Sequence, residues 1–253
     1  MLYYIYDNTY EGLMTAVFDA FARKEKPDRI VPEGHPLPLF TDTHTVISER
    51  EKAERVLNGL KKKLSPSALS MLSVCFLSES DEVPMHILRY IEKTFASPIS
   101  IEVNFADEDV LKLSQIYRRV TWEANRMKQF VRFQKTGDVM FFALIEPDYN
   151  VLPLCYRFFE DRYADQAWII YDRKRHYGVY YDLKKTEVVY FEKPEAFLQA
   201  GKLSQEKLDE QEQAFQKLWK NYLGAITIKE RKNLKLQRQH MPVRYWKYLT
   251  EKS

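Results

Sequence analysis

Cationic and aromatic side chains concentrate in residues 118–133, RRVTWEANRMKQFVRF, where Glu123 is the only acid. The planar guanidinium group of arginine binds phosphate oxygens two at a time, and exposed aromatic rings can stack on nucleobases. The chemistry this stretch could perform is the binding of a polyanion such as nucleic acid. Its cations are Arg118, Arg119, Arg126, Lys128 and Arg132. One alternative stays open: Arg119, Glu123 and Arg126, at i, i+4 and i+7, could form the ion-paired flank of an ordinary helix.

A second cluster lies within residues 158–182, FFEDRYADQAWIIYDRKRHYGVYYD. Cations here occupy a predicted turn between two aromatic strands, so the turn could also contact nucleic acid. The candidate contacts are Arg173, Arg175, Tyr177 and Tyr181. The alternative is that these tyrosines pack on a sheet, which is their commoner use in strands. The same segment contains Asp161, Asp165 and Asp172. Any of the three could serve a nuclease or glycosylase, and the spacing does not single one out.

The third cluster is the basic C-terminal segment. Residues 228–253 contain eight Lys or Arg and two Glu, a net charge of +6, so with +3 for the whole chain the remaining 227 residues carry −3. A basic end on a mildly acidic body favours a polyanionic partner. The candidate contacts are Arg231, Lys235, Arg244 and Trp246. The alternative is a basic tail that is merely solvated.

Several other functions lack a sequence signature. The chain has seven glycines and neither a GxGxxG nor a GxxxxGK[ST] motif, so we expect no phosphate-binding loop of those kinds. No signal peptide and no run of 18 apolar residues are evident, which predicts a cytoplasmic protein without a membrane span. Cys75 and Cys155 have apolar neighbours and are predicted to be buried thiols. The five histidines lack metal-site spacing, so we expect no metal and no cofactor.

Hydrophobic periodicity predicts a single α+β domain over 1–253, with a largely antiparallel sheet and packed helices. Strands are expected at 2–7, 129–133, 139–147, 167–172, 177–182 and 187–191, the first pair after residue 128 forming a hairpin. Helices are expected at 9–24, 48–64, 65–80, 82–97, 107–127, 151–162, 204–222 and 227–250. Thr9, Ser48 and Ser65 are the predicted N-caps. A helical insert then spans about 48–128, the sheet region about 129–191 and a helical basic region 204–253.

Four longer segments carry a resemblance that runs from end to end of the chain. They are YDNTYEGLMTAVFDAF (6–21), RRVTWEANRMKQFVRF (118–133), PDYNVLPLCYRFFEDRYADQAWIIYDRKRHYGVYYD (147–182) and MPVRYWKYLTE (241–251). In these segments the chain resembles a bacterial family of DNA-metabolism or DNA-repair proteins built on a domain of unknown function. The resemblance implies a radical SAM partner that carries a helix-hairpin-helix DNA-binding region. A similar domain occurs ahead of uracil-DNA-glycosylase-like domains. The chain has neither the CxxxCxxC motif nor the GQDPY segment of those partners.

These observations lead to one hypothesis with two alternatives. The chain is expected to be a DNA-binding accessory protein that acts with a radical SAM partner. The first alternative is a DNA-processing enzyme, a nuclease or glycosylase, that uses a carboxylate near 161–172. The second is a module that binds only a protein partner. Whether the chain is itself an enzyme is left open at this point.

Overall fold

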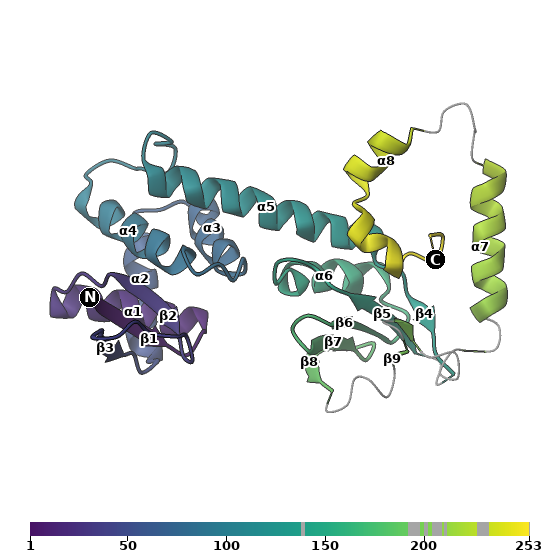
Figure 1. Ribbon diagram of the computed structural model, residues 1–253, viewed down its shortest axis with the longest axis horizontal. Helices are drawn as coiled ribbons and strands as arrows, with labels where there is room; N and C mark the ends of the chain where they lie inside the picture. Colours follow the sequence, from purple (N-terminus) through teal and green to yellow (C-terminus); the bar gives the residue numbers. More distant parts are fainter. Residues whose placement is uncertain are drawn as a thin grey trace. The chain divides into compact units, whose positions relative to one another are not determined.

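The computed structural model describes residues 1–137, 140–191, 198–199, 202–203, 209, 212–226 and 233–252 (Figure 1). The chain forms two compact units, Met1–Thr121 and Trp122–Ser253. The sequence-based prediction of a single domain stays a prediction. Arg231 lies outside the described residues, as do parts of the helices predicted at 204–222 and 227–250.

The first unit contains a three-stranded parallel sheet in the order β2-β1-β3. Its strands are β1 (Leu2–Tyr6), β2 (Arg29–Pro32) and β3 (Asp42–Thr45). Helix α1 (Tyr10–Arg23) connects β1 to its parallel neighbour β2. The predicted N-cap is confirmed, because the Thr9 side chain accepts a hydrogen bond from the Gly12 N–H. Strand β1 and helix α1 were predicted, but the pairing of β2 and β3 with β1 was not.

Four helices complete the first unit: α2 (Arg50–Lys61), α3 (Pro66–Phe76), α4 (Val83–Ala96) and the start of α5 (Glu108–Phe130). Their predicted positions are confirmed. Ser65 caps α3 by accepting from the Ala68 N–H, as predicted. The prediction that Ser48 caps α2 is wrong. The cap position is Glu49, and the Ser48 hydroxyl donates to Asp7 at 2.7 Å. The boundary between the two units falls inside α5.

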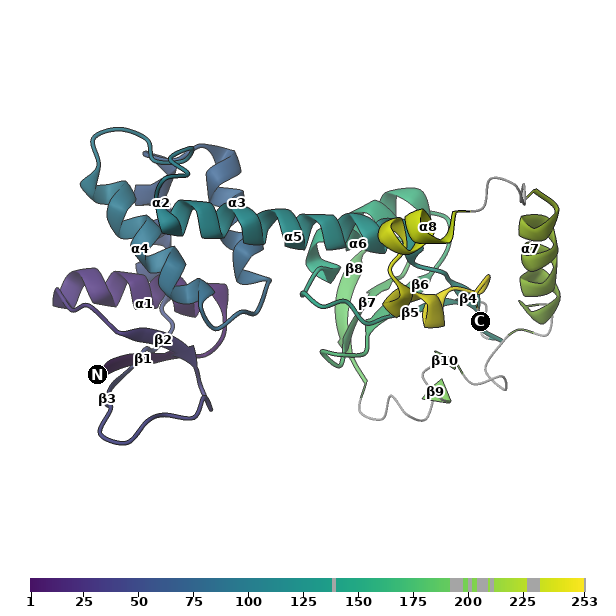
Figure 2. The same ribbon diagram turned by 45° about the horizontal axis from the view of Figure 1, so that its top comes forward.

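The second unit is built on a five-stranded sheet in the order β4-β5-β6-β7-β8 (Figures 1 and 2). Its strands are β4 (Gln134–Lys135), β5 (Phe141–Ile145), β6 (Trp168–Asp172), β7 (Tyr177–Tyr181) and β8 (Thr186–Tyr190). Helix α6 (Leu152–Arg162) joins β5 to β6, which pair in parallel, whereas the other pairings are antiparallel. The α+β class is therefore confirmed.

Two details of the predicted sheet are wrong. Residues 129–133 do not form a strand, because α5 continues to Phe130 and β4 consists of Gln134 and Lys135 alone. The β5–β6 pair is parallel rather than antiparallel. A parallel neighbour needs a crossover connection, and the predicted helix at 151–162 supplies one.

After the sheet, the described chain contains β9 (Leu198–Gln199), β10 (Lys202–Leu203), α7 (Glu212–Ile226), α8 (Leu234–His240) and a 3-10 helix, η4 (Val243–Tyr248). Tyr245 and Leu249 are buried in the second unit and fix the C-terminal segment to it. Among the helices in the described part of the chain, none combines the length and apolar character needed to cross a bilayer.

Candidate nucleic-acid interface

Helix α5 carries the first predicted cluster. Its buried side is formed by Val120, Ala124 and Met127, among others, whereas Arg118, Arg119 and Trp122 are exposed. The exposed fraction of Trp122 is 52%, which is high for so large an apolar side chain. Arg118 and Arg126 lie four residues before and after Trp122, so helical spacing puts all three on one side of the helix. Trp122 was not among the contacts predicted from the sequence, although its position off the apolar stripe could have indicated one.

The other aromatic residues of 118–133, Phe130 and Phe133, pack against aromatic rings of the second unit. The Phe130 ring lies 5.8 Å from the Tyr245 ring, and Phe133 packs against Phe159, Tyr163 and Trp168. Figures 1 and 2 show α6 beside the second half of α5. There the Lys128 ammonium lies 5.9 Å from the centre of the Phe158 ring. Of the aromatic residues in 118–133, Trp122 is therefore the one with an exposed side chain.

Glu123 is not a surface partner of Arg119 or Arg126. Only 1% of the residue is exposed, and its carboxylate accepts the backbone N–H groups of Asp148 and Tyr149 at 3.1 and 2.9 Å. It also accepts the Tyr245 hydroxyl at 2.7 Å and Arg244 Nη2 at 2.5 Å. Burial, and then the hydrogen bond to Glu123, raise the pKa of Tyr245 to about 12. Glu123 thus ties α5 to the loop after β5 and to the C-terminal segment.

Of the five C-terminal cations that the structure describes, two pair with carboxylates of the same unit. Arg244 contacts both Glu123 and Asp148, and Lys247 contacts Glu146. Arg132, predicted as part of the first cluster, lies 2.8 Å from Glu251. We call these paired residues the C-terminal clamp: Glu123, Arg132, Glu146, Asp148, Arg244, Lys247 and Glu251. The clamp already neutralises Arg132 and Arg244, which leaves them less able to bind phosphate.

The remaining predicted contacts at this end differ in environment. Trp246 is half-buried: its Nε1–H donates to the Met241 carbonyl at 3.0 Å, and the Lys252 ammonium lies 4.7 Å from its ring centre. Lys235 is exposed on α8. The candidate cation Lys235 and the candidate ring of Trp246 therefore lie on different short helices, α8 and η4.

The turn between β6 and β7 is organised by Asp172. This carboxylate is fully buried and accepts the backbone N–H of Lys174 at 2.9 Å and Arg175 Nη1 at 2.8 Å. Burial raises the pKa of Asp172, while its hydrogen bond with Arg175 acts in the opposite direction. The Arg175 guanidinium also donates to the carbonyls of Pro147 and Asp148. Asp172 therefore has a structural role in the turn, whereas Asp161 and Asp165 are exposed.

The tyrosines of this hairpin are engaged as well. Tyr181 is buried, stacks on Trp168 at 5.5 Å and donates to the Ala164 carbonyl. The Tyr177 hydroxyl donates to Asn150 Oδ1 at 2.5 Å. Arg173 is exposed at the turn. The sheet-packing alternative for these tyrosines therefore describes Tyr181 well. In the described residues, no group of three His, Cys, Asp or Glu side chains could hold a metal ion.

The comparison with known proteins gives one match. Residues 81–251 match the model of a family described as a domain of unknown function, DUF4130, and this range is more than half of the chain. The chain therefore belongs to that family. Neither a curated protein nor a solved structure is significantly similar to it.

Proposed function

We propose that this protein binds nucleic acid through the exposed side of α5, as an accessory protein of DNA metabolism that presents DNA to a radical SAM partner. The observation that carries the proposal is Trp122, an exposed ring with Arg118 and Arg126 one helical turn to either side. A ring in this position can stack on an unpaired base while the arginines contact the neighbouring phosphates. Lys128, at i+6 from Trp122, lies on a different side of the helix and contacts the Phe158 ring of α6.

The ligand that fits this arrangement is a single strand or a distorted duplex. A single tryptophan cannot stack on a base that is already stacked and paired within a regular duplex. The family resemblance supports DNA metabolism as the setting and a radical SAM protein as the partner. Arg132, Arg175 and Arg244 are less suited to bind phosphate, because carboxylates of the chain already pair with them.

The test compares two exposed tryptophans, Trp122 on α5 and Trp219 on α7. Trp122→Ala should weaken binding of a labelled single-stranded oligonucleotide by about 1–3 kcal/mol, or roughly five- to 150-fold. Trp219→Ala, the same change on a different helix, should leave this affinity unchanged. Fluorescence anisotropy at several salt concentrations measures both variants. Arg126→Ala should also flatten the salt dependence by about 0.7 in log–log slope if it contacts one phosphate.

A second candidate function is the protein-interaction module, and α7 is the observation that favours it. Phe215, Leu218, Trp219 and Tyr222 are all exposed and lie at i, i+3, i+4 and i+7. This spacing is the one by which an amphipathic helix inserts into an apolar groove of a partner. The Trp219 and Tyr222 rings stack at 5.8 Å, which gives the helix a continuous aromatic surface.

The same two variants separate the two functions. If the protein only binds a protein partner, Trp219→Ala should abolish co-purification of the radical SAM protein and Trp122→Ala should not, while neither changes oligonucleotide binding. If Trp122→Ala is folded and binds every oligonucleotide with wild-type affinity and salt dependence, the nucleic-acid proposal is wrong.

A further inference from the structure

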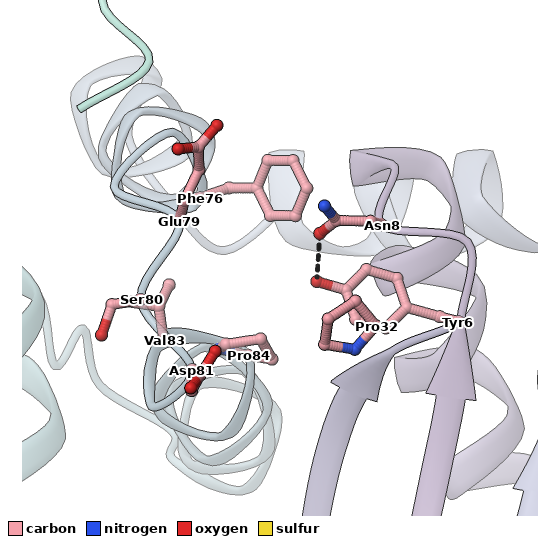
Figure 3. Close-up of a pocket in the computed structure, with 9 residues that line it drawn as sticks. All are labelled: Tyr6, Asn8, Pro32, Phe76, Glu79, Ser80, Asp81, Val83 and Pro84. Atoms are coloured by element: carbon pink, nitrogen blue, oxygen red, sulfur yellow. Dashed lines mark hydrogen bonds between the residues drawn. The ribbon is translucent and has the colours of Figure 1, made fainter. Parts of the chain in front are cut away.

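The first unit contains a cavity of about 260 Å³ that the proposed function does not use (Figure 3). It lies between the carboxyl ends of β1 and β2 and the turn that joins α3 to α4. Its base is apolar and buried, whereas its rim is polar and exposed. The lining residues are Tyr6, Asn8, Pro32, Phe76, Glu79, Ser80, Asp81, Val83 and Pro84.

The position in the fold is one where ligands bind. Small molecules in α/β sheets occupy the space outside the carboxyl ends of parallel strands, and β1 and β2 are parallel. The usual anion position, at the start of the helix after β1, is filled by the chain itself. Asp7 accepts the Thr9 N–H at 3.0 Å and the Ser48 hydroxyl at 2.7 Å there. A phosphate is therefore excluded from the start of α1, and the open space is the cavity beside it.

The charge of the cavity selects its ligand. Of the nine described residues that line it, two are carboxylates, Glu79 and Asp81, and none is basic. At the base, burial and then the nearby charges of Asp7 and Asp81 raise the pKa of Tyr6 to about 12. An anionic ligand would be repelled, and a cationic ligand would be attracted to the rim.

The apolar surfaces suit a flat group. In Figure 3 the Phe76 ring points across the cavity toward Asn8, and Pro84 lies on the opposite side from Pro32 and Tyr6. The Tyr6 hydroxyl donates to Asn8 Oδ1 at 3.3 Å, which holds this edge of the cavity in place. Ring-shaped ligands make extensive contacts with such proline and aromatic surfaces, and Phe76 can also attract a cation through its face.

We propose that this cavity binds a small organic cation with an apolar ring, whose amidinium, guanidinium or ammonium group lies at the rim beside Asp81 and Glu79. The ring would occupy the base formed by Tyr6, Val83 and Pro84. Six of the nine lining residues precede residue 81, where the family match begins, so the site belongs largely to the N-terminal part of the chain. It is independent of the nucleic-acid proposal, which concerns the solvent side of α5.

Three probes with the same ring and different charges test the proposal on the full chain: benzamidine, benzamide and benzoate. Calorimetric titration should give the tightest binding for benzamidine, about tenfold weaker binding for neutral benzamide, and none for benzoate. Asp81→Asn should weaken benzamidine binding about fivefold and leave benzamide binding unchanged. Glu51→Gln, which removes an exposed carboxylate from α2 of the same unit, is the matched control.

The proposal is overturned by any of three results. The first is no saturable benzamidine binding at millimolar concentration. The second is equal affinity for the three probes, which would indicate a merely apolar hollow. The third is an equal effect of Asp81→Asn and Glu51→Gln, which would indicate attraction to the net charge of the chain rather than to this rim. Because Asp81 is exposed, the variant should fold, and circular dichroism checks that it does.

Discussion

Arg244 and Glu123, which are 121 residues apart in the sequence, form an ion pair with Arg244 Nη2 2.5 Å from Glu123 Oε1. The Glu123 side chain is 2% exposed and the Arg244 side chain is 40% exposed. The partly solvated guanidinium of Arg244 therefore pairs with a buried carboxylate. Removal of one partner of such a pair costs more than the pair contributes, because the buried charge is then left with fewer partners. The pair therefore holds the C-terminal segment in place.

This relationship predicts the effect of Arg244→Ala on stability. The free energy of unfolding should fall by about 1–2 kcal/mol, a value reduced from that of a fully buried pair because Arg244 is partly solvated. Arg119→Ala, which removes an exposed arginine of the same helix that carries Glu123, should change it by less than about 0.5 kcal/mol. Urea unfolding measures both. If the Arg244→Ala variant had wild-type stability and weakened DNA binding, Arg244 would be a nucleic-acid contact rather than a structural residue.

The structural features that depend on residues close together in the sequence were predicted correctly. The caps Thr9 and Ser65 need only the backbone three residues ahead, and the apolar stripe of α5 follows from helical spacing, so these features were found. Trp122 could have been found by the same spacing. The buried environments of Cys75 and Cys155 also follow from their apolar neighbours, and both thiols are buried.

The partners of the cations could not be predicted in this way. Arg132 pairs with Glu251, 119 residues later, and Glu123 meets Arg244 from a distant segment. Nothing in the spacing of a charged residue reveals such a long-range partner, so exposed and paired arginines look alike in a sequence. The parallel β5–β6 pair was missed for a related reason: strand direction depends on where the intervening helix returns the chain.

A second prediction concerns pH and the contact of Glu146 with Lys247. The Lys247 ammonium, followed by the Tyr248 hydroxyl, lowers the pKa of Glu146 below its ordinary value of 4.5. A lowered folded-state pKa means that the contact stabilises the protein above pH 4.5 and that this contribution is lost as the pH falls through the lower value. Glu146→Gln should therefore cost about 0.5–1 kcal/mol at pH 7 and nothing at a pH below the folded-state pKa.

Urea unfolding of both proteins between pH 7 and pH 3 measures the difference. The Glu51→Gln variant controls for the loss of one negative charge from the chain. A difference between wild type and Glu146→Gln that stays constant over the whole range would mean that Glu146 does not exchange its proton in this contact. A difference that grows at low pH would reverse the sign and refute the lowered pKa.

The last prediction concerns Gly12, in the first turn of α1. Alanine is favoured over glycine inside a helix by up to about 1 kcal/mol, so propensity alone predicts that Gly12→Ala stabilises the protein. At this position, however, a Cβ atom would lie 2.1 Å from Asp7 Oδ1 and 2.7 Å from Ser48 Oγ. Hydrogen bonds with Thr9 and Ser48 hold the Asp7 carboxylate there. We therefore expect Gly12→Ala to destabilise the protein by about 1–3 kcal/mol.

A double-mutant cycle identifies the cause of this cost. Asp7→Ala removes the carboxylate that the new methyl group would meet most closely, so the cost of Gly12→Ala should become smaller in the Asp7→Ala background than in the wild type. Gly59→Ala in α2 is the matched control, because its Cβ would meet only the end of the Phe95 ring, at 3.0 Å. That ring can move, so the control should cost less. Additive effects of the two changes at residues 7 and 12 would show that Asp7 does not exclude a side chain from the start of α1, and a phosphate could then compete for the same position.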